Sequence, residues 1–348
     1  MTRPASGTPR LSVILPTLNE AANLPGLLTQ LRAQQGIALQ IIVADGGSTD
    51  ATREIAEHQG AEWLEGPAGR ALQMNLGATR ARADWLLFLH ADSGLSDPGQ
   101  LARALAALRA TRQQLGHERV AGHFRLRFQR TRPGHDLAYH YYQEKSALNR
   151  PECTNGDQGL LLSRAFFRQL GGFDESLWFL EDQRLAETIR RLGVWITLPG
   201  ELLTSARRFE QEGLGRRMVL SALIMNFHAM GWREFFERAS DLYRNQDQTA
   251  RLQLKPIFRL IDQLNRETGR KVSRQRWLAT GRYVLGHAWQ PAFFLDVALA
   301  YRWGLRRRLF LPLHERLFEP LCGLRPLHYV TAALTWLWFR AYGRWLDE

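Results

Sequence analysis

Cysteine is scarce in this chain of 348 residues. Only two are present, Cys153 and Cys322, and they lie far apart in the sequence. Their separation excludes a disulfide framework and a Cys-x-x-Cys metal site, and it favours a reducing, cytoplasmic setting. A chain of this length buries enough surface to be stable without cross-links. It has room for two domains, or for one large domain with an appendage.

Long apolar runs are also missing. The longest nearly uncharged one, residues 327–339, is shorter than the roughly 20 residues that a membrane-spanning helix needs. We therefore expect no transmembrane helix. Residues 1–10 lack the apolar segment of a secretory signal, so we expect them to form a flexible N-terminus. No GxGxxG motif follows an expected strand, which disfavours a dehydrogenase.

Acidic residues are too few to balance the basic ones, and the imbalance is concentrated near the end of the chain. The net charge is +12, and the segment Phe235 to Glu348 contributes +9 of it, with 19 Lys and Arg against 10 Asp and Glu. Residues 248–348 also hold six of the eleven tryptophans. This charge points to an anionic partner, either phospholipid or nucleic acid.

The first two thirds of the chain alternate between strand and helix patterns. We expect strands at residues 11–15, 40–44, 61–64, 85–89, 120–128, 159–163 and 194–197. We expect helices at residues 20–34, 48–59, 74–81, 101–114, 164–170 and 181–192, with Ser48 or Thr49 capping the second of them. This alternation predicts an α/β fold with a mostly parallel central sheet. From Leu214 onward the pattern is helical.

Acidic residues follow several of the expected strands. Asp45 comes directly after the second strand, Asp92 follows the strand at 85–89, and Glu181 and Asp182 begin a helix. Each could be an ordinary turn or helix-cap residue. Because ligands bind at the carboxyl ends of strands in open α/β sheets, we expect them to share one site.

Four segments resemble the successive motifs of family 2 glycosyltransferases. They read SVILPTLNEAANL, IIVADGGSTDAT, GRALQMNLGATRARADWLLFLHADS and GGFDESLWFLEDQRLAETIRRLG. FLHAD and SARRFE are similar to signatures of a bacterial subgroup that includes proteins of arsenosugar biosynthesis. The resemblance implies a GT-A glycosyltransferase domain at 11–232. Residues 248–348 fall outside the resemblance, and the helical pattern, charge and tryptophans predict a helical, basic, tryptophan-rich region at 233–348.

The resemblance also implies roles for individual residues. Asp182 would be the catalytic base, with Glu181 beside it, and Asp92 would bind a divalent metal. His90 could be an imidazole ligand of that metal, or it could merely fill space. The nucleotide would lie against a group of residues along the same edge: Pro16, Asn19, Glu20, Asp45, Arg70, Asn75 and Ala91. The reaction implied is transfer of a sugar from a nucleotide-diphosphate donor by single displacement, with inversion.

The chemistry explains these residue types. Mg²⁺ or Mn²⁺ stabilises the charge that develops on a diphosphate leaving group, and one or two carboxylates suffice to hold it. A carboxylate base takes the proton of the acceptor hydroxyl. His90 occupies the position of the first Asp in the family's DXD motif, so its part in metal binding differs from that of a carboxylate.

Other polar and aromatic residues suit the diphosphate or the acceptor. Asp157 lies in a glycine-rich turn, and Arg207 and Arg208 follow an expected strand on what the pattern predicts to be a loop. An arginine there could contact the diphosphate with its planar guanidinium. Trp178 precedes the acidic pair and could stack on a sugar ring, although such aromatics more often lie in a core.

Three alternatives remain open at this stage: a nucleotidyltransferase, a nucleic-acid-binding protein, and a scaffold without catalytic activity. Nucleotidyltransferases carry a glycine-rich basic loop after the first strand, and the chain lacks such a loop after residues 11–15. It also lacks a recognisable nucleic-acid-binding motif. Peripheral contact of residues 233–348 with the cytoplasmic face of a membrane is a further hypothesis. A helical subdomain with a basic outer face is its alternative. The acceptor, a lipid or a small metabolite, is not specified.

Overall fold

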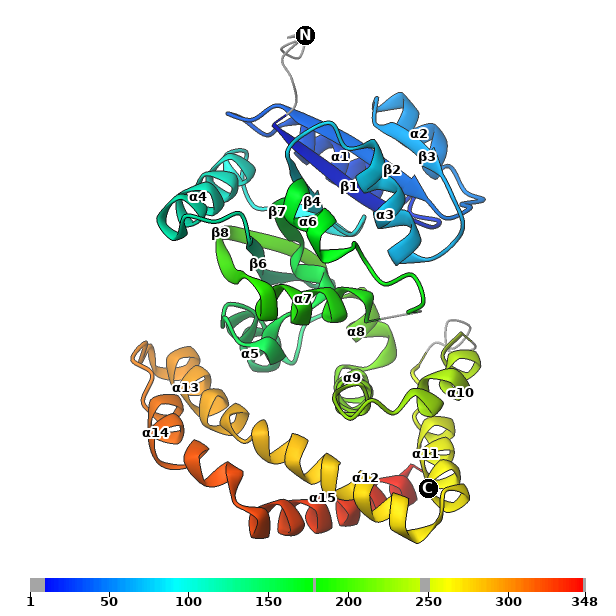
Figure 1. Ribbon diagram of the computed structural model, residues 1–348, viewed down its shortest axis with the longest axis vertical. Coiled ribbons are helices and arrows are strands. Elements are labelled where there is room, and N and C mark those ends of the chain that lie inside the picture. The colour runs from blue at the N-terminus through cyan, green and yellow to red at the C-terminus, as the bar shows by residue number, and fades with distance from the viewer. Residues whose placement is uncertain (1–9, 178–179, 245–250, 347–348) are drawn as a thin grey trace. The chain divides into compact units, whose positions relative to one another are not determined.

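The computed structural model describes residues 10–177, 180–244 and 251–346 (Figure 1). The expected flexible N-terminus lies outside these residues except for Arg10. The chain divides into two compact units, which are considered separately. Residues 10–129 and Ala138–Ser205 form the first, and residues Arg130–Leu137 and 206–346 form the second. The predicted boundary at residue 232 stays a prediction.

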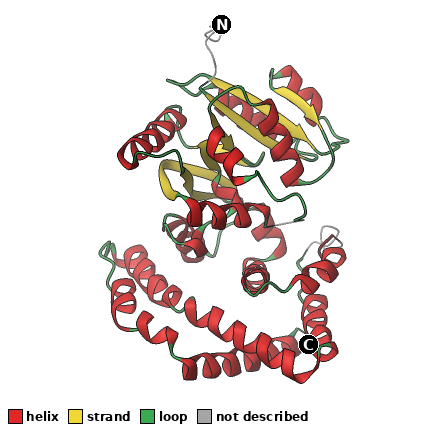
Figure 2. Cartoon of the chain, viewed as in Figure 1, coloured by secondary structure: helices red, strands yellow, loops and turns green. Residues whose placement is uncertain are grey.

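The first unit combines strands and helices (Figure 2). Its strands are β1 (Leu11–Thr17), β2 (Leu39–Asp45), β3 (Glu62–Glu65), β4 (Trp85–Phe88), β5 (Ser93–Leu95), β6 (Val120–Gln129), β7 (Leu160–Ser163) and β8 (Val194–Ser205). Its helices are α1 (Leu24–Arg32), α2 (Thr52–His58), α3 (Arg70–Arg80), α4 (Gln100–Leu115), α5 (Asp136–Ser146), α6 (Arg164–Leu170) and α7 (Glu181–Leu192), with short 3-10 turns η1 (Pro151–Cys153) and η2 (Gly156–Gln158).

All eight strands belong to one mixed sheet in the order β3-β2-β1-β4-β7-β6-β8-β5. Strands β1 to β4 are parallel to one another, whereas β7 runs antiparallel to both of its neighbours. Strands β6 and β8 are again parallel. This arrangement confirms the predicted α/β fold with a mixed, mostly parallel sheet.

Hydrophobic cores cover both faces of the sheet, because side chains alternate along each strand. In β1, Val13 and Leu15 join the core that includes α1 and α4. Ile14 points to the opposite face and joins the core that includes α3, α6 and α7. Strands buried on both faces are typical of parallel sheets. The near-continuous apolar run of β1 therefore has a direct structural cause.

Several element boundaries differ from those expected. Helix α2 begins at Thr52 without a side-chain cap, because the Ser48 hydroxyl donates to Asp45 and Thr49 hydrogen-bonds to Asn19. The predicted cap was therefore wrong. Strand β8 continues past its expected end at residue 197 to Ser205. Its Pro199-Gly200 pair resembles a turn in sequence but lies at a register irregularity opposite Phe124 and Arg125.

The second unit is helical throughout its described residues (Figure 2). Its helices are α8 (Arg207–Glu212), α9 (Leu214–Ala229), α10 (Arg233–Arg244), α11 (Lys255–Glu267), α12 (Gly269–Gly286), α13 (Trp289–Trp303), α14 (Phe310–Leu317) and α15 (Arg325–Trp345), with a short 3-10 helix η4 (Glu319–Gly323). The helical C-terminal region expected from the sequence is thus present, and helix α8 replaces the loop expected at Arg207 and Arg208.

One core joins α9, α10, α11 and α15 through residues such as Phe227, Leu264 and Phe339. Helices α12 and α15 cross closely: a Cβ at Gly281 would lie 2.6 Å from the backbone of Ala332. Beyond this core, the buried carboxylate of Asp296 accepts hydrogen bonds from three backbone N–H groups at the beginning of α14. It thereby fixes the turn between α13 and α14.

Candidate active site

The ends of β4 and β7 bring three of the predicted residues together. In this antiparallel pair Phe88 lies opposite Leu160, so the residues after β4 and those before β7 share one edge of the sheet. His90 follows β4 and Asp157 precedes β7, and their Nδ1 and Oδ1 atoms are 3.4 Å apart. Asp92 is close enough for its charge to act on the His90 ring.

Two carboxylates and one guanidinium act on the pKa of His90. Burial by itself lowers the pKa of this imidazole. The hydrogen bond and negative charge of Asp157, aided by Asp92, outweigh burial and raise the pKa above its ordinary value, although Arg70 opposes them. His90 is therefore linked to two carboxylates and one guanidinium.

A second charged pair joins the beginnings of α3 and α7. Arg70 Nε lies 2.9 Å from Glu181 Oε1, and the Glu181 side chain is only 2% exposed. Among the described residues, Oε2 of Glu181 has no hydrogen-bond partner. Burial raises the pKa of Glu181, and the neighbouring Asp182 raises it further, whereas the charge of Arg70 lowers it. Glu181 is thus a buried carboxylate held by one exposed cation.

Asp182 lies beside the turn that carries Asp157. A Cβ atom built on Gly156 would be 2.0 Å from Asp182 Oδ2, so no larger residue fits at position 156 unless the carboxylate moves. Asp182 is partly exposed, in contrast to Glu181. The contact between Gly156 and Asp182 brings the predicted base next to the His90–Asp157 pair.

Asp45 is deeply buried at the end of β2. Its carboxylate accepts hydrogen bonds from the Thr17 hydroxyl at 2.9 Å, from the backbone N–H groups of Gly47 and Ser48 at 2.8 and 2.7 Å, and from the Ser48 hydroxyl at 2.5 Å. Four donors occupy the acceptor positions that a carboxylate offers. Asp45 therefore shapes the turn after β2.

Asn19 and Glu20 connect the loops that follow β1 and β2. Asn19 has a φ of +56°, a left-handed conformation that asparagine tolerates. Its side-chain oxygen accepts a hydrogen bond from the Thr49 backbone, and its own N–H donates to the Ser48 hydroxyl. The Glu20 N–H donates to the Thr52 hydroxyl. The two loops are thus held together at the carboxyl ends of their strands.

The sequence analysis missed Gln73, which lies one turn after Arg70 on α3. Its buried amide donates to the backbone oxygens of Thr17 at 2.7 Å and Ala44 at 2.8 Å. These carbonyls belong to the ends of β1 and β2. Helix α3 therefore contacts both the Asp45 region, through Gln73, and Glu181, through Arg70. A buried glutamine in an amphipathic helix is the signal that could have revealed this residue.

The remaining predicted residues have varied positions. Asn75 hydrogen-bonds with Phe173 and Glu175, so it anchors the segment before α7. Pro16 is buried in β1 beyond the residues that pair with β4, where its missing N–H breaks no bond to that strand. Ala91 is buried between His90 and Asp92.

Two predicted residues belong to the second unit, and a third is not described. Arg207 and Arg208 are exposed at the beginning of α8, in the second unit. Their contact with a diphosphate stays a prediction. Trp178 lies outside the described residues.

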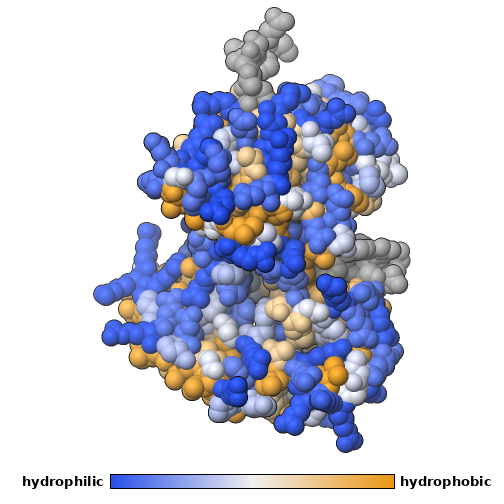
Figure 3. Space-filling model, in the orientation of Figure 1, coloured by the Kyte–Doolittle hydropathy of each residue, from blue (hydrophilic) through white to orange (hydrophobic). Residues whose placement is uncertain are grey.

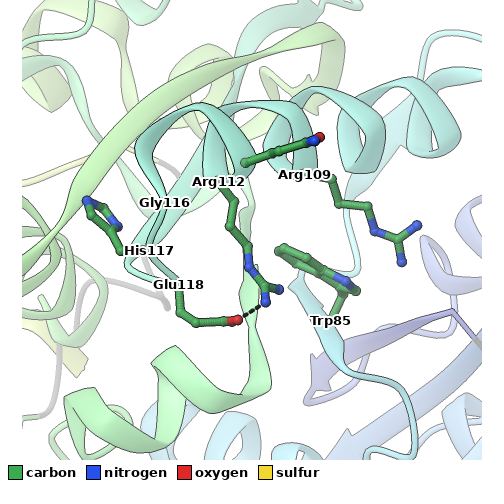
Figure 4. A pocket seen from close by; sticks show the side chains of 7 residues that line it. Trp85, Arg109, Arg112, Gly116, His117 and Glu118 are labelled. Atoms are coloured by element: carbon green, nitrogen blue, oxygen red, sulfur yellow. Dashed lines mark ion pairs between the residues drawn. The ribbon is translucent and has the colours of Figure 1, made fainter.

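A cavity of about 510 Å³ occurs elsewhere in the first unit (Figure 4). Its wall contains Trp85, the first residue of β4, flanked by Arg109 and Arg112 with each guanidinium carbon 5.7 Å from the indole centroid. Arg112 is ion-paired with Glu118. Because Trp85 begins β4 and His90 follows its end, this cavity lies at the opposite edge of the sheet from the candidate site.

The donor atoms near His90 fit a hard divalent ion. Two carboxylates, Asp92 and Asp157, and one imidazole are present, and Mg²⁺ and Mn²⁺ prefer oxygen ligands while keeping several waters. Within residues 10–177, 180–244 and 251–346, no three His, Cys, Asp or Glu side chains form a complete ligand cluster.

Comparison with known proteins covers part of this site. Residues 12–171 match the family model described as Glycosyl transferase family 2. This segment is therefore similar to family 2 glycosyltransferases. The match spans just under half of the chain and includes all the predicted nucleotide and metal residues together with Asp157. With the mixed sheet, it confirms the predicted GT-A fold.

Several glycosyltransferases are similar to this family 2 segment or to the chain. A PGL/p-HBAD biosynthesis glycosyltransferase of Mycobacterium bovis is 38% identical over 105 residues, covering 28% of this chain and 41% of that protein. The 4,4'-diaponeurosporenoate glycosyltransferase of Staphylococcus haemolyticus is 35% identical over 107 residues, 27% of each chain. The chain thus spans less than half the length of these relatives.

Among solved structures, the mannosyltransferase of Pyrobaculum calidifontis in complex with GDP-Man and Mn²⁺ is similar over 96% of this chain and 88% of that one. Its sequence identity is 18% and its TM-score is 0.48.

Proposed function

We propose that this chain transfers a sugar from a nucleotide-diphosphate donor to an acceptor hydroxyl, with inversion at the sugar carbon. One observation carries the proposal. The structure joins two charged groups, His90 with Asp92 and Asp157, and Arg70 with Glu181 and Asp182, at one edge of the sheet. The first group lies within the segment that matches the family 2 model, and so does Arg70.

Asp182 is the proposed catalytic base. It is partly exposed, so an acceptor can reach it, and its carboxylate lies against Gly156. A carboxylate that accepts the hydroxyl proton during attack makes the acceptor oxygen a better nucleophile. Glu181, buried behind it and paired with Arg70, positions the beginning of α7.

Asp92 and His90 are the proposed ligands of Mg²⁺ or Mn²⁺, with Asp157 beside them. When bound, the ion supplies positive charge that stabilises the departing diphosphate. Asp157 holds the His90 ring through their contact at 3.4 Å, which orients the imidazole relative to Asp92. Arg70 adds a further positive charge close to His90 and Glu181.

The nucleotide is proposed to occupy the carboxyl ends of β1 and β2, against Asn19, Glu20 and Asp45. Asp45 already accepts four hydrogen bonds, so a nucleobase N–H would take the place of the Ser48 hydroxyl. This exchange is feasible because a hydroxyl can rotate to another partner. Gln73 keeps the ends of both strands in register during binding.

The acceptor class is a lipid or a small metabolite, and the reaction is placed in the cytoplasm. Cys153 and Cys322 are both free thiols, which supports a reducing compartment. Neither a second reaction class nor sequence-specific nucleic-acid binding is supported by any feature of the site.

A ligand screen with a matched variant tests the proposed function. Nucleotide diphosphates and nucleotide sugars are added with Mn²⁺, and the melting temperature is measured. Ligands that bind only the native state raise it. Asp182→Asn should retain this shift and lose roughly 10²- to 10⁴-fold in hydrolysis or transfer of the best donor. Glu54→Gln, an exposed substitution on α2, is the control. If no nucleotide sugar stabilises the protein, the proposal is wrong.

The metal assignment has its own test. Asp92→Ala should abolish the Mn²⁺-dependent part of the donor-induced shift, and excess EDTA should do the same to the unmodified protein. Full turnover of Asp92→Ala in EDTA would falsify the assignment.

A further inference from the structure

Exposed hydrophobic side chains are concentrated at the end of the chain. Of the 24 large hydrophobic side chains exposed among the described residues, 19 lie between Phe294 and Trp345. Figure 3 shows hydrophobic surface along the lower left edge, over the place where Figure 1 draws α14 and the beginning of α15. Soluble proteins rarely expose apolar residues in such density without a partner.

Helix α15 has an apolar outer face. It packs on α12, and only Ala332 and Phe339 of its side chains are buried. The opposite face carries Leu327, Val330, Leu334 and Leu337, each exposed, and residues 326–339 contain no Asp, Glu, Lys or Arg. A helix on a protein surface normally turns charged residues to water. The outer face of α15 is therefore suited to contact with an apolar partner.

Arginines border this apolar surface. Residues 294–345 contain eight arginines against three acidic residues. One acidic residue, Asp296, is buried beneath the α13–α14 turn, whereas Arg306 and Arg307 are exposed in that turn. Tryptophans such as Trp336 and Trp338 lie at the sides of the α15 face and are about 43% exposed. Tryptophan and arginine around an apolar stripe are typical of helices that lie in a membrane interface.

A basic cavity adjoins the C-terminal end of the same helix. Its volume is about 240 Å³, and the charged residues of its wall are Lys255, Arg259, Asp262 and Arg266 of α11 together with Arg340 and Arg344 of α15. Asp262 is ion-paired with Arg266 and Arg340. Arg344 is two helical turns after Leu337, so both side chains lie on the same face. The cationic side chains outnumber the one carboxylate, so the cavity keeps a net positive charge that suits a phosphate headgroup.

From these features we propose that residues 294–345 are a docking surface for an anionic phospholipid bilayer, with α15 lying flat in the interface. The described residues include no helix long and apolar enough to cross a membrane. Arg325 at the beginning of α15 and Arg344 near its end would keep both ends at the headgroup level. The proposal does not depend on the proposed enzymatic function.

The charge distribution selects a bilayer over other occupants. A second copy of the chain placed face to face would bring the arginine-rich borders together, and like charges in an interface oppose association. A nucleic acid would match the arginines but would leave Leu334, Leu337 and Trp338 against water. An anionic bilayer satisfies both the charge and the apolar face.

Cosedimentation of the full chain with vesicles tests the proposal. Vesicles of neutral phosphatidylcholine are compared with vesicles containing 30% phosphatidylglycerol, about the anionic fraction at which surface charge attracts basic segments. The chain should bind the anionic vesicles at least tenfold more tightly, and binding should weaken as salt rises, because salt screens the arginines.

Two pairs of substitutions separate the apolar and the charged contributions. Leu334→Glu with Leu337→Glu should lower vesicle affinity at least tenfold, and Arg306→Gln with Arg307→Gln should lower it roughly tenfold or more. The matched controls are in the first unit: Leu115→Glu with Leu192→Glu, and Arg80→Gln with Arg119→Gln, all exposed positions. Neither control pair should change vesicle binding.

Tryptophan fluorescence of the unmodified chain tests membrane contact independently of whether the substituted proteins fold. Brominated lipids should quench tryptophan fluorescence, and Trp336→Phe with Trp338→Phe should remove part of the quenching. The proposal is overturned if neutral and anionic vesicles bind equally. It is also overturned if neither test pair changes binding, or if the leucine pair converts a dimer to a monomer with vesicle affinity unchanged.

Discussion

At the scale of single residues, the contact between Gly156 and Asp182 controls where the proposed base lies. The 2.0 Å separation found for a Cβ at position 156 is far below any real contact distance, and the atom in its way ends a short side chain that can rotate. An added methyl group would therefore displace the carboxylate rather than unfold the turn. We therefore expect an added methyl group at position 156 to affect catalysis and to have little effect on folding.

We predict that Gly156→Ala lowers kcat about a hundredfold, since a shift of about 1 Å in a catalytic group has an effect of this size. The melting temperature should change little. Gly26→Ala is the control, because no atom lies within 4 Å of a Cβ built there. Steady-state kinetics and thermal melts of both variants measure the effect. Unchanged kcat in Gly156→Ala would show that Asp182 is not the base.

The pairing of Arg70 with Glu181 predicts a pH effect. Burial raises the pKa of Glu181 and Arg70 opposes this, so Arg70→Met should raise that pKa further. The protonated form of Glu181 would then persist to higher pH. We expect the acid limb of kcat/KM, measured from pH 5 to 9, to move to higher pH. Arg80→Met, at the other end of α3, should leave the limb in place, and superimposable profiles for all three proteins would contradict the prediction.

At the scale of elements, β6 and β8 enclose a buried histidine. His123 is fully buried, accepts a hydrogen bond from the Trp195 indole, and stacks on that ring with centroids 5.4 Å apart. Burial lowers the pKa of His123 to about 4. The folded state therefore binds fewer protons than the unfolded state at pH values between this pKa and the ordinary one near 6.5.

The free energy of unfolding should therefore decrease as the pH is lowered through that window. The contribution of neutral His123 is fully present above about pH 6.5 and is lost as the pH falls toward 4, amounting to about 3 kcal/mol. Urea unfolding between pH 4 and 7 measures it. His123→Gln keeps an acceptor for Trp195 and should have a flatter profile, whereas exposed His58→Gln should match the unmodified protein. Equal slopes in all three would exclude a role for His123.

The sequence predicted the elements that depend on local pattern. Helices α6 and α7 begin and end as expected, and β1, β2 and β4 lie within two residues of their expected bounds. Asp92, Glu181 and Asp182 could be chosen because strand ends and helix beginnings are visible in a sequence. These predictions required no knowledge of which strands are neighbours.

The elements and site residues that could not be predicted depend on contacts between distant segments. The second half of β8 pairs with β6 across an irregularity that its Pro-Gly pair conceals. Strand β5 is three residues long and exists because it pairs with β8. Gln73 meets the carbonyls of two strands more than 25 residues away in sequence. No local pattern contains such information, because tertiary contacts determine these elements.

At the scale of the whole molecule, two units with separate cores should respond to different ligands. We predict that a nucleotide sugar with Mn²⁺ raises the melting of the first unit by several degrees. Anionic vesicles should instead raise the melting temperature of the second unit. Scanning calorimetry with each ligand measures the melting temperatures of both units. One transition that moves as a whole with either ligand would show that the two units unfold together.

Asp296 gives the second unit a further property. By accepting three backbone N–H groups at the beginning of α14, it holds the turn that carries Arg306 and Arg307 in one conformation before any partner arrives. A preorganised turn surrenders little conformational entropy on association. Encounter with a charged surface would then require no loop ordering, and capture would proceed at a rate governed by diffusion and electrostatic attraction.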